Sequence, residues 1–184
     1  METAPNEEYI AGKEAITSIE KSVMDKEKAE IKEKIVISSP VTGLAADLST
    51  APDEAFAGRM MGDGAVVTPT DKHVYAPEVG EVCFVFETKH AIGFLTESGQ
   101  TMLLHIGIDT VKFIGEGFKV FVENGQKVKK GEPLLELNLA YLNEHAPSMV
   151  SPILCTELEG NQEVRLLADG PVKAGEPLFE IINW

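Results

Sequence analysis

From Ile35 onward, short apolar or alternating segments are separated by glycine and proline. Segments of this length, spacing and punctuation are typical of strands in an all-β sandwich or barrel. Helix is expected only in short pieces, over residues 53–57 and 139–146, and the second piece must end before Pro147. The pattern therefore predicts an all-β fold, an antiparallel β-sandwich or barrel with short helices only.

Two internal repeats sharpen this prediction. Residues 125–137 are echoed by residues 170–181, and both copies contain Val-x-x-Gly-Glu-Pro-Leu. The glycine suits a turn and the proline suits the first residue of a new strand. A second echo relates residues 39–43 to residues 76–80. The repeats indicate a fold built from duplicated strand-and-turn units.

Residues 1–34 have a different character. They contain nine acidic and six basic residues, and no glycine after Gly12. Apolar residues recur at near-helical spacing, which favours a helix with one thin apolar stripe. The net charge of −3 disfavours an anionic membrane surface. We expect an N-terminal extension or tether over residues 1–34, and one domain over residues 35–184.

Two histidines on neighbouring predicted strands stand out. Side chains alternate between the faces of a strand, so Thr88 and His90 share one face, and His105 and Gly107 share one face of the next segment. A two-residue turn at Ser98-Gly99 would place His90 opposite Gly107. The imidazoles of His90 and His105 would then be diagonal neighbours within side-chain reach.

Such a pair suits three tasks, namely binding a metal, relaying a proton, or carrying and stabilising a phosphoryl group. Zinc held by His90 and His105 with a further ligand from a partner protein would be regulatory, because a catalytic zinc normally takes three protein ligands and the chain has no His-x-His. A swinging-arm carrier domain is a further alternative. It needs a lysine exposed at a hairpin tip, and Lys72 lacks the flanking residues of that motif. His73 and His145 are expected to be exposed and inert.

Composition narrows the function classes further. The chain has 184 residues, enough for one domain with its own core, and a net charge of −14. That charge argues against nucleic acid and favours basic partners. Cys83 and Cys155 lie in apolar segments and are expected to be buried, reduced thiols. No signal sequence or membrane span is recognised, so we expect a cytoplasmic protein.

Several motifs carry a resemblance to a known family. They are Phe-Glu-Thr-Lys-His-Ala at residues 86–91, His-Ile-Gly-Ile-Asp-Thr-Val at 105–111 and Gly-Glu-Gly-Phe at 115–118. Pro-Val-Thr-Gly at 40–43 and Gly-Asp-Gly at 62–64 extend the match. Over roughly residues 35–184 the chain resembles the glucose-type enzyme IIA domain of the bacterial phosphoenolpyruvate:sugar phosphotransferase system.

The resemblance implies a role for each residue of the histidine network. His105 would accept a phosphoryl group on Nε2 from the phosphohistidine of the carrier HPr and pass it to a cysteine of a sugar-specific IIB domain. His90 would stabilise the group, because a donated N–H offsets part of its negative charge. The carbonyl of Gly107 would hold Nδ1–H of His105, and Thr88 would orient the histidines.

The resemblance also implies a docking rim, with acids that face basic groups on the partners. The rim comprises Phe56, Phe86, Leu103 and Ile106, and the acids are Asp53 and Asp109; plain core packing is the alternative for Phe86 and Ile106. No cofactor and no direct sugar contact are implied. A monomer associated peripherally with a membrane permease is expected. A regulatory module, whose phosphorylation state controls transporters or metabolic enzymes, remains open.

Overall fold

The structure, a computed structural model, describes residues 30–184. In this part of the chain fourteen strands pair antiparallel in three sheets, and helix is confined to four short segments. The α-helices are α2 (Glu54–Ala57) and α3 (Leu139–His145), and the 3-10 helices are η1 (Leu48–Thr50) and η2 (Thr110–Phe113). The predicted all-β class with short helices only is confirmed.

The largest sheet has eight strands in the order β13-β2-β3-β11-β7-β6-β5-β9. Their bounds are β13 (Gly170–Val172), β2 (Gly43–Asp47), β3 (Asp63–Pro69), β11 (Ser151–Cys155), β7 (Thr101–His105), β6 (Ala91–Thr96), β5 (Gly80–Val85) and β9 (Lys127–Val128). The hairpin β6–β7 therefore lies in the interior of this sheet, with β11 and β5 on its two sides.

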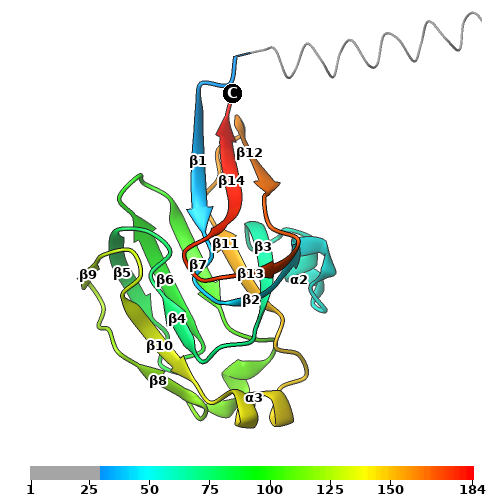
Figure 1. Cartoon of the computed structure of the whole chain (residues 1–184), viewed down its shortest axis with the longest axis vertical. Coiled ribbons are helices and arrows are strands. Elements are labelled where there is room, and N and C mark those ends of the chain that lie inside the picture. The colour runs from blue at the N-terminus through cyan, green and yellow to red at the C-terminus, as the bar shows by residue number, and fades with distance from the viewer. Residues whose placement is uncertain (1–29) are drawn as a thin grey trace, which may run out of the picture.

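Two three-stranded sheets complete the fold. One comprises β1 (Glu33–Ser38), β14 (Pro177–Asn183) and β12 (Gln162–Leu166), and it projects from the rest of the molecule (Figure 1). The other comprises β4 (His73–Tyr75), β10 (Pro133–Leu137) and β8 (Phe118–Val120). None of the helices within residues 30–184 combines the length and the apolar composition that crossing a membrane requires.

The duplicated units make equivalent backbone contacts. Gly131 donates its N–H to the carbonyl of Ala76 at 2.9 Å, and Gly175 donates to the carbonyl of Ser39 at 2.8 Å. In the same way β9 pairs with β5 through Gly80, and β13 pairs with β2 through Gly43. The two Gly-Glu-Pro turns thus contact the first residues of the two related segments, 76–80 and 39–43, in the same way.

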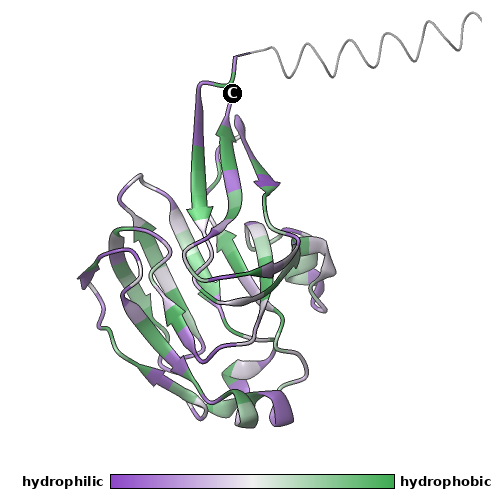
Figure 2. Ribbon diagram, in the orientation of Figure 1, coloured by the Kyte–Doolittle hydropathy of each residue, from purple (hydrophilic) through white to green (hydrophobic). Residues whose placement is uncertain are grey.

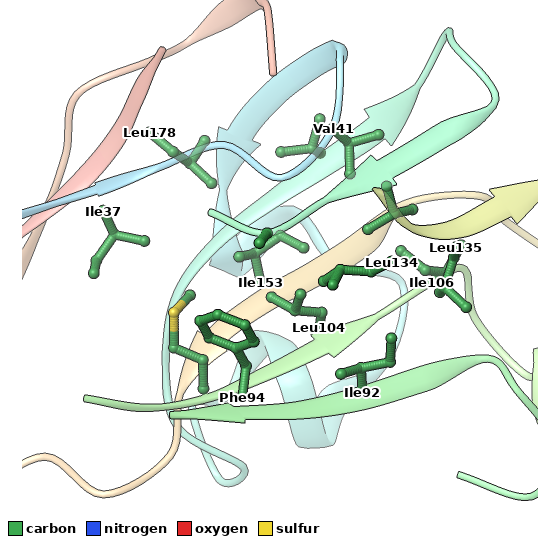
Figure 3. Packing of buried hydrophobic residues seen from close by; sticks show 14 of the residues in the cluster. Ile37, Val41, Ile92, Phe94, Leu104, Ile106, Leu134, Leu135, Ile153 and Leu178 are labelled. Atoms are coloured by element: carbon green, nitrogen blue, oxygen red, sulfur yellow. The ribbon is translucent and has the colours of Figure 1, made fainter. Parts of the chain in front are cut away.

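The eight-stranded sheet is buried on both faces near its centre, where strands are apolar without interruption. In β3, Ala65 and Val67 join the main core, whereas Val66 joins a second cluster; in β11, Ile153 and Leu154 divide in the same way. Figure 3 shows part of the main core, and Figure 2 shows hydrophobic residues concentrated along the strands. The second cluster consists of Leu48, Ala51, Phe56, Val66, Ile108 and Leu154.

The predicted N-terminal extension lies outside the described residues except for residues 30–34. Of these, Glu33 and Lys34 form the start of β1, where they pair with Asn183 and Ile182 of β14. The extension over residues 1–34 and the domain boundary therefore stay predictions.

Candidate functional site

His105 is the last residue of β7 and lies on the face covered by the second cluster. Alternation along β7 sends Met102 and Leu104 into the main core, while Leu103 packs against the second cluster. His105 shares the face of Leu103, and its ring centroid lies 4.9 Å from that of Phe56. A strand end therefore presents the imidazole beside an aromatic ring that comes from a different segment, α2.

The short helix α2 exists because it is capped at its N-terminus. The Asp53 carboxylate accepts hydrogen bonds from the N–H groups of Ala55 at 2.9 Å and Phe56 at 3.4 Å. These groups would otherwise lack partners, so an acidic N-cap stabilises the turn. Of the two acids expected to face a partner, Asp53 thus makes a structural contact of its own. The helix predicted over residues 53–57 is confirmed, with Asp53 as its cap.

The register predicted for the histidine hairpin is wrong by one residue. His105 lies opposite Ala91, and Ile106 N–H donates to the carbonyl of His90 at 2.9 Å. The turn has three residues, and its third, Gly99, has a φ of +94°. The Thr96 hydroxyl accepts from the N–H of Gln100 at 2.9 Å, which stabilises this wider turn.

The two imidazoles nevertheless meet, because His90 lies outside the regular strand. β6 begins at Ala91, and Lys89 before it has a φ of +60°, so the chain turns sharply there. The ring centroids of His90 and His105 are 4.9 Å apart with an interplanar angle of 83°. His90 is 4% exposed. The juxtaposition was predicted, whereas the turn that produces it was not.

Hydrogen bonds orient both rings. Nδ1 of His105 lies 2.8 Å from the carbonyl oxygen of Gly107, which can only accept, so Nδ1 carries the proton and Nε2 has a free lone pair. Nδ1 of His90 lies 2.7 Å from the Thr88 hydroxyl, which can donate or accept. Thr88 and Gly107 therefore occupy the positions that the resemblance implied.

Two further residues, which the sequence did not reveal, hold Gly107. The buried Ser151 hydroxyl accepts from Gly107 N–H at 3.0 Å, and the buried Thr110 hydroxyl donates to the carbonyl of Ile106. Gly107 has a φ of +72°, and a Cβ there would lie 2.6 Å from Thr110 Cγ2. Both the backbone conformation and the space require glycine at this position.

Burial sets the electrostatics of the pair. Burial lowers the pKa of His105 to about 4, and the neighbouring His90 also lowers it. The hydrogen bond to the Gly107 carbonyl and the carboxylates of Asp53 and Asp109 raise this pKa, but by less. Burial also lowers the pKa of His90. Both imidazoles are therefore neutral at pH 7, and Nε2 of His105 is available as a nucleophile.

Apolar side chains border the pair. The Phe86 ring centroid lies 5.4 Å from that of His90, and Phe84, 49% exposed, lies 5.2 Å from Phe86. Phe84 was missed, although aromatic residues two apart on a strand predict a shared face. Ile106 differs from the other expected rim residues, because its side chain is fully buried in the main core and offers no surface to a partner.

The structure also places the acid Asp109, the two cysteines and His145. Asp109 is exposed, and its Oδ2 lies 3.9 Å from Nζ of Lys112. Cys155 is buried as predicted, but the prediction for Cys83 is wrong, because a register shift in β5 between Val82 and Phe84 leaves Cys83 exposed. His145 is exposed as predicted.

His73 is instead partly buried, with Nε2 3.7 Å from a Glu136 carboxylate oxygen. Within residues 30–184 no group of three or more histidine, cysteine or acidic side chains could hold a metal ion. A hollow of about 710 Å³ opens between turns near Thr42, Lys130 and Lys173, and neither site histidine lines it.

A model of the phosphoenolpyruvate-dependent sugar phosphotransferase system EIIA 1 family matches residues 35–161. The chain is 47% identical over 144 residues to the N-acetylglucosamine-specific EIICBA component of Klebsiella pneumoniae, which covers 78% of this chain and 22% of that protein. It is 41% identical over 161 residues to the glucoside-specific EIICBA component of Staphylococcus carnosus, covering 86% and 23%. The chain thus spans less than a quarter of these relatives. Glucose permease IIA from Mycoplasma capricolum has the same fold, with a TM-score of 0.75 and 35% identity, over 82% of this chain and 97% of that one.

Proposed function

Since the chain belongs to the phosphoenolpyruvate-dependent sugar phosphotransferase system EIIA 1 family, we propose that Nε2 of His105 carries its phosphoryl group. Family membership makes the chain a phosphotransferase component with a phosphoryl-carrier role. One observation supports the assignment to His105 above the others: its Nδ1–H is held by the Gly107 carbonyl, so the unprotonated nitrogen is Nε2.

The proposed step uses the histidine as a nucleophile. The Nε2 lone pair of His105 attacks the phosphorus of a phosphohistidine on HPr, the old P–N bond breaks, and its electron pair returns to the donor nitrogen. The proton stays on Nδ1 throughout and is donated in a hydrogen bond to the Gly107 carbonyl oxygen. In the second step a cysteine sulfur of a IIB domain attacks the same phosphorus, and the Nε2 lone pair is restored.

His90 would stabilise the arriving charge. When the Thr88 hydroxyl donates to Nδ1 of His90, the proton of that ring is on Nε2 and is available to a phosphoryl oxygen. The His90 ring lies 4.9 Å from the His105 ring and is buried, so it is oriented before the group arrives. A preoriented donor in a site of low dielectric costs little reorganisation.

The partners would dock over the histidine pair. Phe56, Phe86, Leu103 and Phe84 form the apolar part of this proposed surface, which would exclude water from the transfer. Asp109 adds a negative charge to this surface, and the net charge of −14 for the whole chain favours basic partners. We therefore assign phospho-HPr and a IIB domain as partners, with no sugar contact by this chain.

The setting follows from the same proposal. Residues 35–184 would act as the phosphocarrier domain and residues 1–34 as its tether. The domain would work as a monomer in the cytoplasm, close to the membrane permease that it supplies. Regulatory targets would recognise the same surface. A metal held by His90 and His105 would need a further ligand from a partner protein, because no group of three or more such side chains within residues 30–184 could hold one.

The test is phosphorylation by phosphoenolpyruvate, enzyme I and HPr, followed by transfer to a IIB domain. We expect His105→Ala to abolish acceptance. His90→Gln keeps an N–H donor and should still accept, but pass the group on poorly. The matched control is His145→Gln, because His145 is exposed at the end of α3. Acceptance by His105→Ala at the control's rate would refute the assignment.

A further inference from the structure

The segment that carries Phe56 is an excursion from the sheet. β2 ends at Asp47 and β3 begins at Asp63, and these strands are hydrogen-bonded neighbours in which Asp47 pairs with Ala65. Residues 48–62 leave the sheet after Asp47 and return to it at Asp63. They contain η1 and α2 and no ladder pairing. The orientation of Phe56 therefore depends on its packing in the second cluster and on the polar contact that ties the excursion to the sheet.

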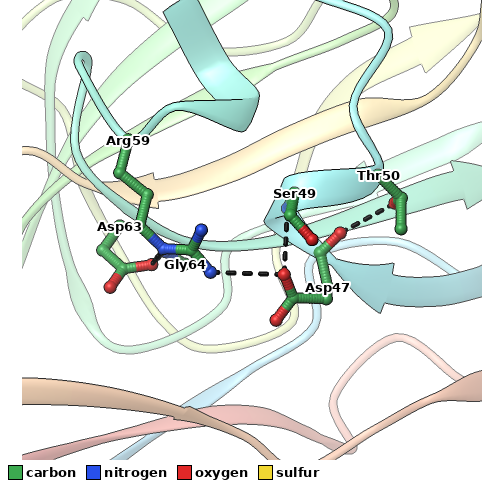
Figure 4. Close-up of polar contacts among 6 residues, drawn as sticks. All are labelled: Asp47, Ser49, Thr50, Arg59, Asp63 and Gly64. Atoms are coloured by element: carbon green, nitrogen blue, oxygen red, sulfur yellow. Dashed lines mark hydrogen bonds and ion pairs between the residues drawn. The ribbon is translucent and has the colours of Figure 1, made fainter. Parts of the chain in front are cut away.

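Arg59 makes that tie (Figure 4). Its Nε donates to Asp63 Oδ1 at 3.1 Å, and its Nη2 donates to Asp47 Oδ1 at 3.2 Å. One guanidinium thus bridges the last residue of β2 and the first residue of β3. Asp47 Oδ1 also accepts from Ser49 N–H at 2.9 Å, so the same carboxylate caps η1. The base of the excursion is closed by a planar, fork-shaped donor.

The backbone of Arg59 is as specific as its side chain. Arg59 has a φ of +59°, a conformation that non-glycine residues adopt uncommonly. It follows Gly58, the residue that caps the end of α2, and its N–H donates to the carbonyl of Phe56 at 3.0 Å. The side chain is 42% exposed, and ion pairs at such exposure add little to global stability. The contact is therefore better explained by orientation of α2 than by stabilisation of the fold.

We propose that Arg59 is a positioning residue for phosphoryl transfer, which bridges Asp47 and Asp63 and thereby holds the Phe56 ring against His105. This inference rests on the proposed role of His105 as the phosphoryl carrier. Phe56 is mostly buried in the second cluster and lies 4.9 Å from the His105 ring, so it shields one side of the imidazole from water. Loosening the excursion would expose His105 and disorder the docking surface around it.

The experiment compares Arg59→Gln with Arg165→Gln. Arg165 is a matched control, because it also pairs with an acid, Glu163, at 3.9 Å, but on β12 in a different sheet. Two quantities are measured: the pKa of His105 by NMR, and the rate of acceptance from phospho-HPr. For Arg59→Gln we expect the pKa to rise from about 4 towards the value of free histidine. The acceptance rate should fall by about tenfold. The control should change neither.

Two milder variants keep the proposal testable if Arg59→Gln does not fold. Asp47→Asn keeps an oxygen to cap η1 and removes only the charge that Arg59 uses, so it should shift both quantities in the same direction by less. Arg59→Lys should restore the rate partly, because an ammonium cannot reproduce the fork.

The outcomes separate this inference from the proposed function. An unchanged His105 pKa in Arg59→Gln would overturn the positioning role, and a lowered rate would then indicate that Arg59 contacts the partner. Wild-type behaviour in both measurements would overturn the inference and leave His105 as carrier. Failure of the wild-type chain itself to accept the group would remove the proposed function instead.

Discussion

Phosphoryl acceptance by His105 should be insensitive to acid over a range in which an ordinary histidine would already be protonated. Only the neutral imidazole has a lone pair on Nε2, so acceptance follows the neutral fraction of His105. Burial lowers its pKa to about 4, whereas free histidine has a pKa of about 6.5. Acceptance should therefore stay constant from pH 8 to about pH 5 and fall only as the pH approaches 4.

The size of the effect follows from the two pKa values. At pH 5.5 a group with a pKa of 4 is about 97% neutral, because the ratio of neutral to protonated form is 10 to the power 1.5. A group with a pKa of 6.5 is about 9% neutral at the same pH. The buried site thus retains about tenfold more nucleophile than an exposed imidazole would.

NMR titration of the His105 ring measures this directly, with His105→Gln used to assign the resonance. It is free of the titration of HPr, which complicates kinetic profiles. Acceptance rates at pH 7.5 and 5.5 then test the functional consequence, with the donor supplied as preformed phospho-HPr. A titration midpoint for His105 near 6.5 would refute the reasoning, because it would mean that neither burial nor His90 disfavours the charged form.

The same shift predicts how stability depends on pH. The unfolded chain protonates His105 near pH 6.5, whereas the folded chain does so near pH 4, so the unfolded state binds more protons in between. The free energy of unfolding should therefore decrease as the pH falls from 6.5 to 4, by up to about 3 kcal/mol from this residue. Urea denaturation of wild type and His105→Gln checks this, and parallel curves for the two would contradict it.

Three substitutions test the network around the pair. Gly107→Ala forces a Cβ to within 2.6 Å of Thr110 Cγ2 at a positive φ, and should lower the unfolding free energy by about 2–4 kcal/mol in thermal denaturation; an unshifted melting temperature would contradict the geometry. Ser151→Ala leaves the N–H of Gly107 without its acceptor and should cost about 1–3 kcal/mol in urea denaturation; a loss below 0.5 kcal/mol, on the order of a surface substitution, would argue against it. Thr88→Val keeps the shape but removes the bond to His90, and should slow transfer to IIB, whereas Thr88→Ser should restore it; equal rates for both variants would show that the hydroxyl has no role.

The sequence predicted those features that depend on local chemistry. Alternation and turn residues identified the strands, and the Val-x-x-Gly-Glu-Pro-Leu units predicted two turns that make equivalent contacts at Gly131 and Gly175. The short helix expected over residues 53–57 is present as α2, and the structure adds that the Asp53 carboxylate caps it. The histidine pair, with Thr88 and Gly107 beside it, was recognised from short motifs.

Features that depend on irregular backbone were not predictable in this way. The hairpin register depends on the Thr96 side chain, which stabilises a three-residue turn and shifts the pairing by one residue. The exposure of Cys83 depends on a register shift inside β5, which reverses the alternation. Neither leaves a signal in hydrophobic periodicity.

Contacts between distant segments were also invisible. Ser151 reaches Gly107 across 44 positions, and nothing near Ser151 suggests this. The resemblance placed Ile106 in the docking rim with core packing as the alternative, and the structure shows the alternative, because the Ile106 side chain lies in the main core. Arg59 is recognisable only when Asp47 and Asp63 are seen to be neighbours at the base of one excursion.

The most direct test of the central claim is to identify the phosphorylated nitrogen. The chain, labelled with 15N in its histidine rings, would be phosphorylated by phosphoenolpyruvate, enzyme I and HPr, and the phosphorus would be correlated with ring nitrogens by NMR. We predict coupling to Nε2 of His105, with the proton retained on Nδ1 by the Gly107 carbonyl. Coupling to Nδ1, or to a nitrogen of His90, would contradict the account.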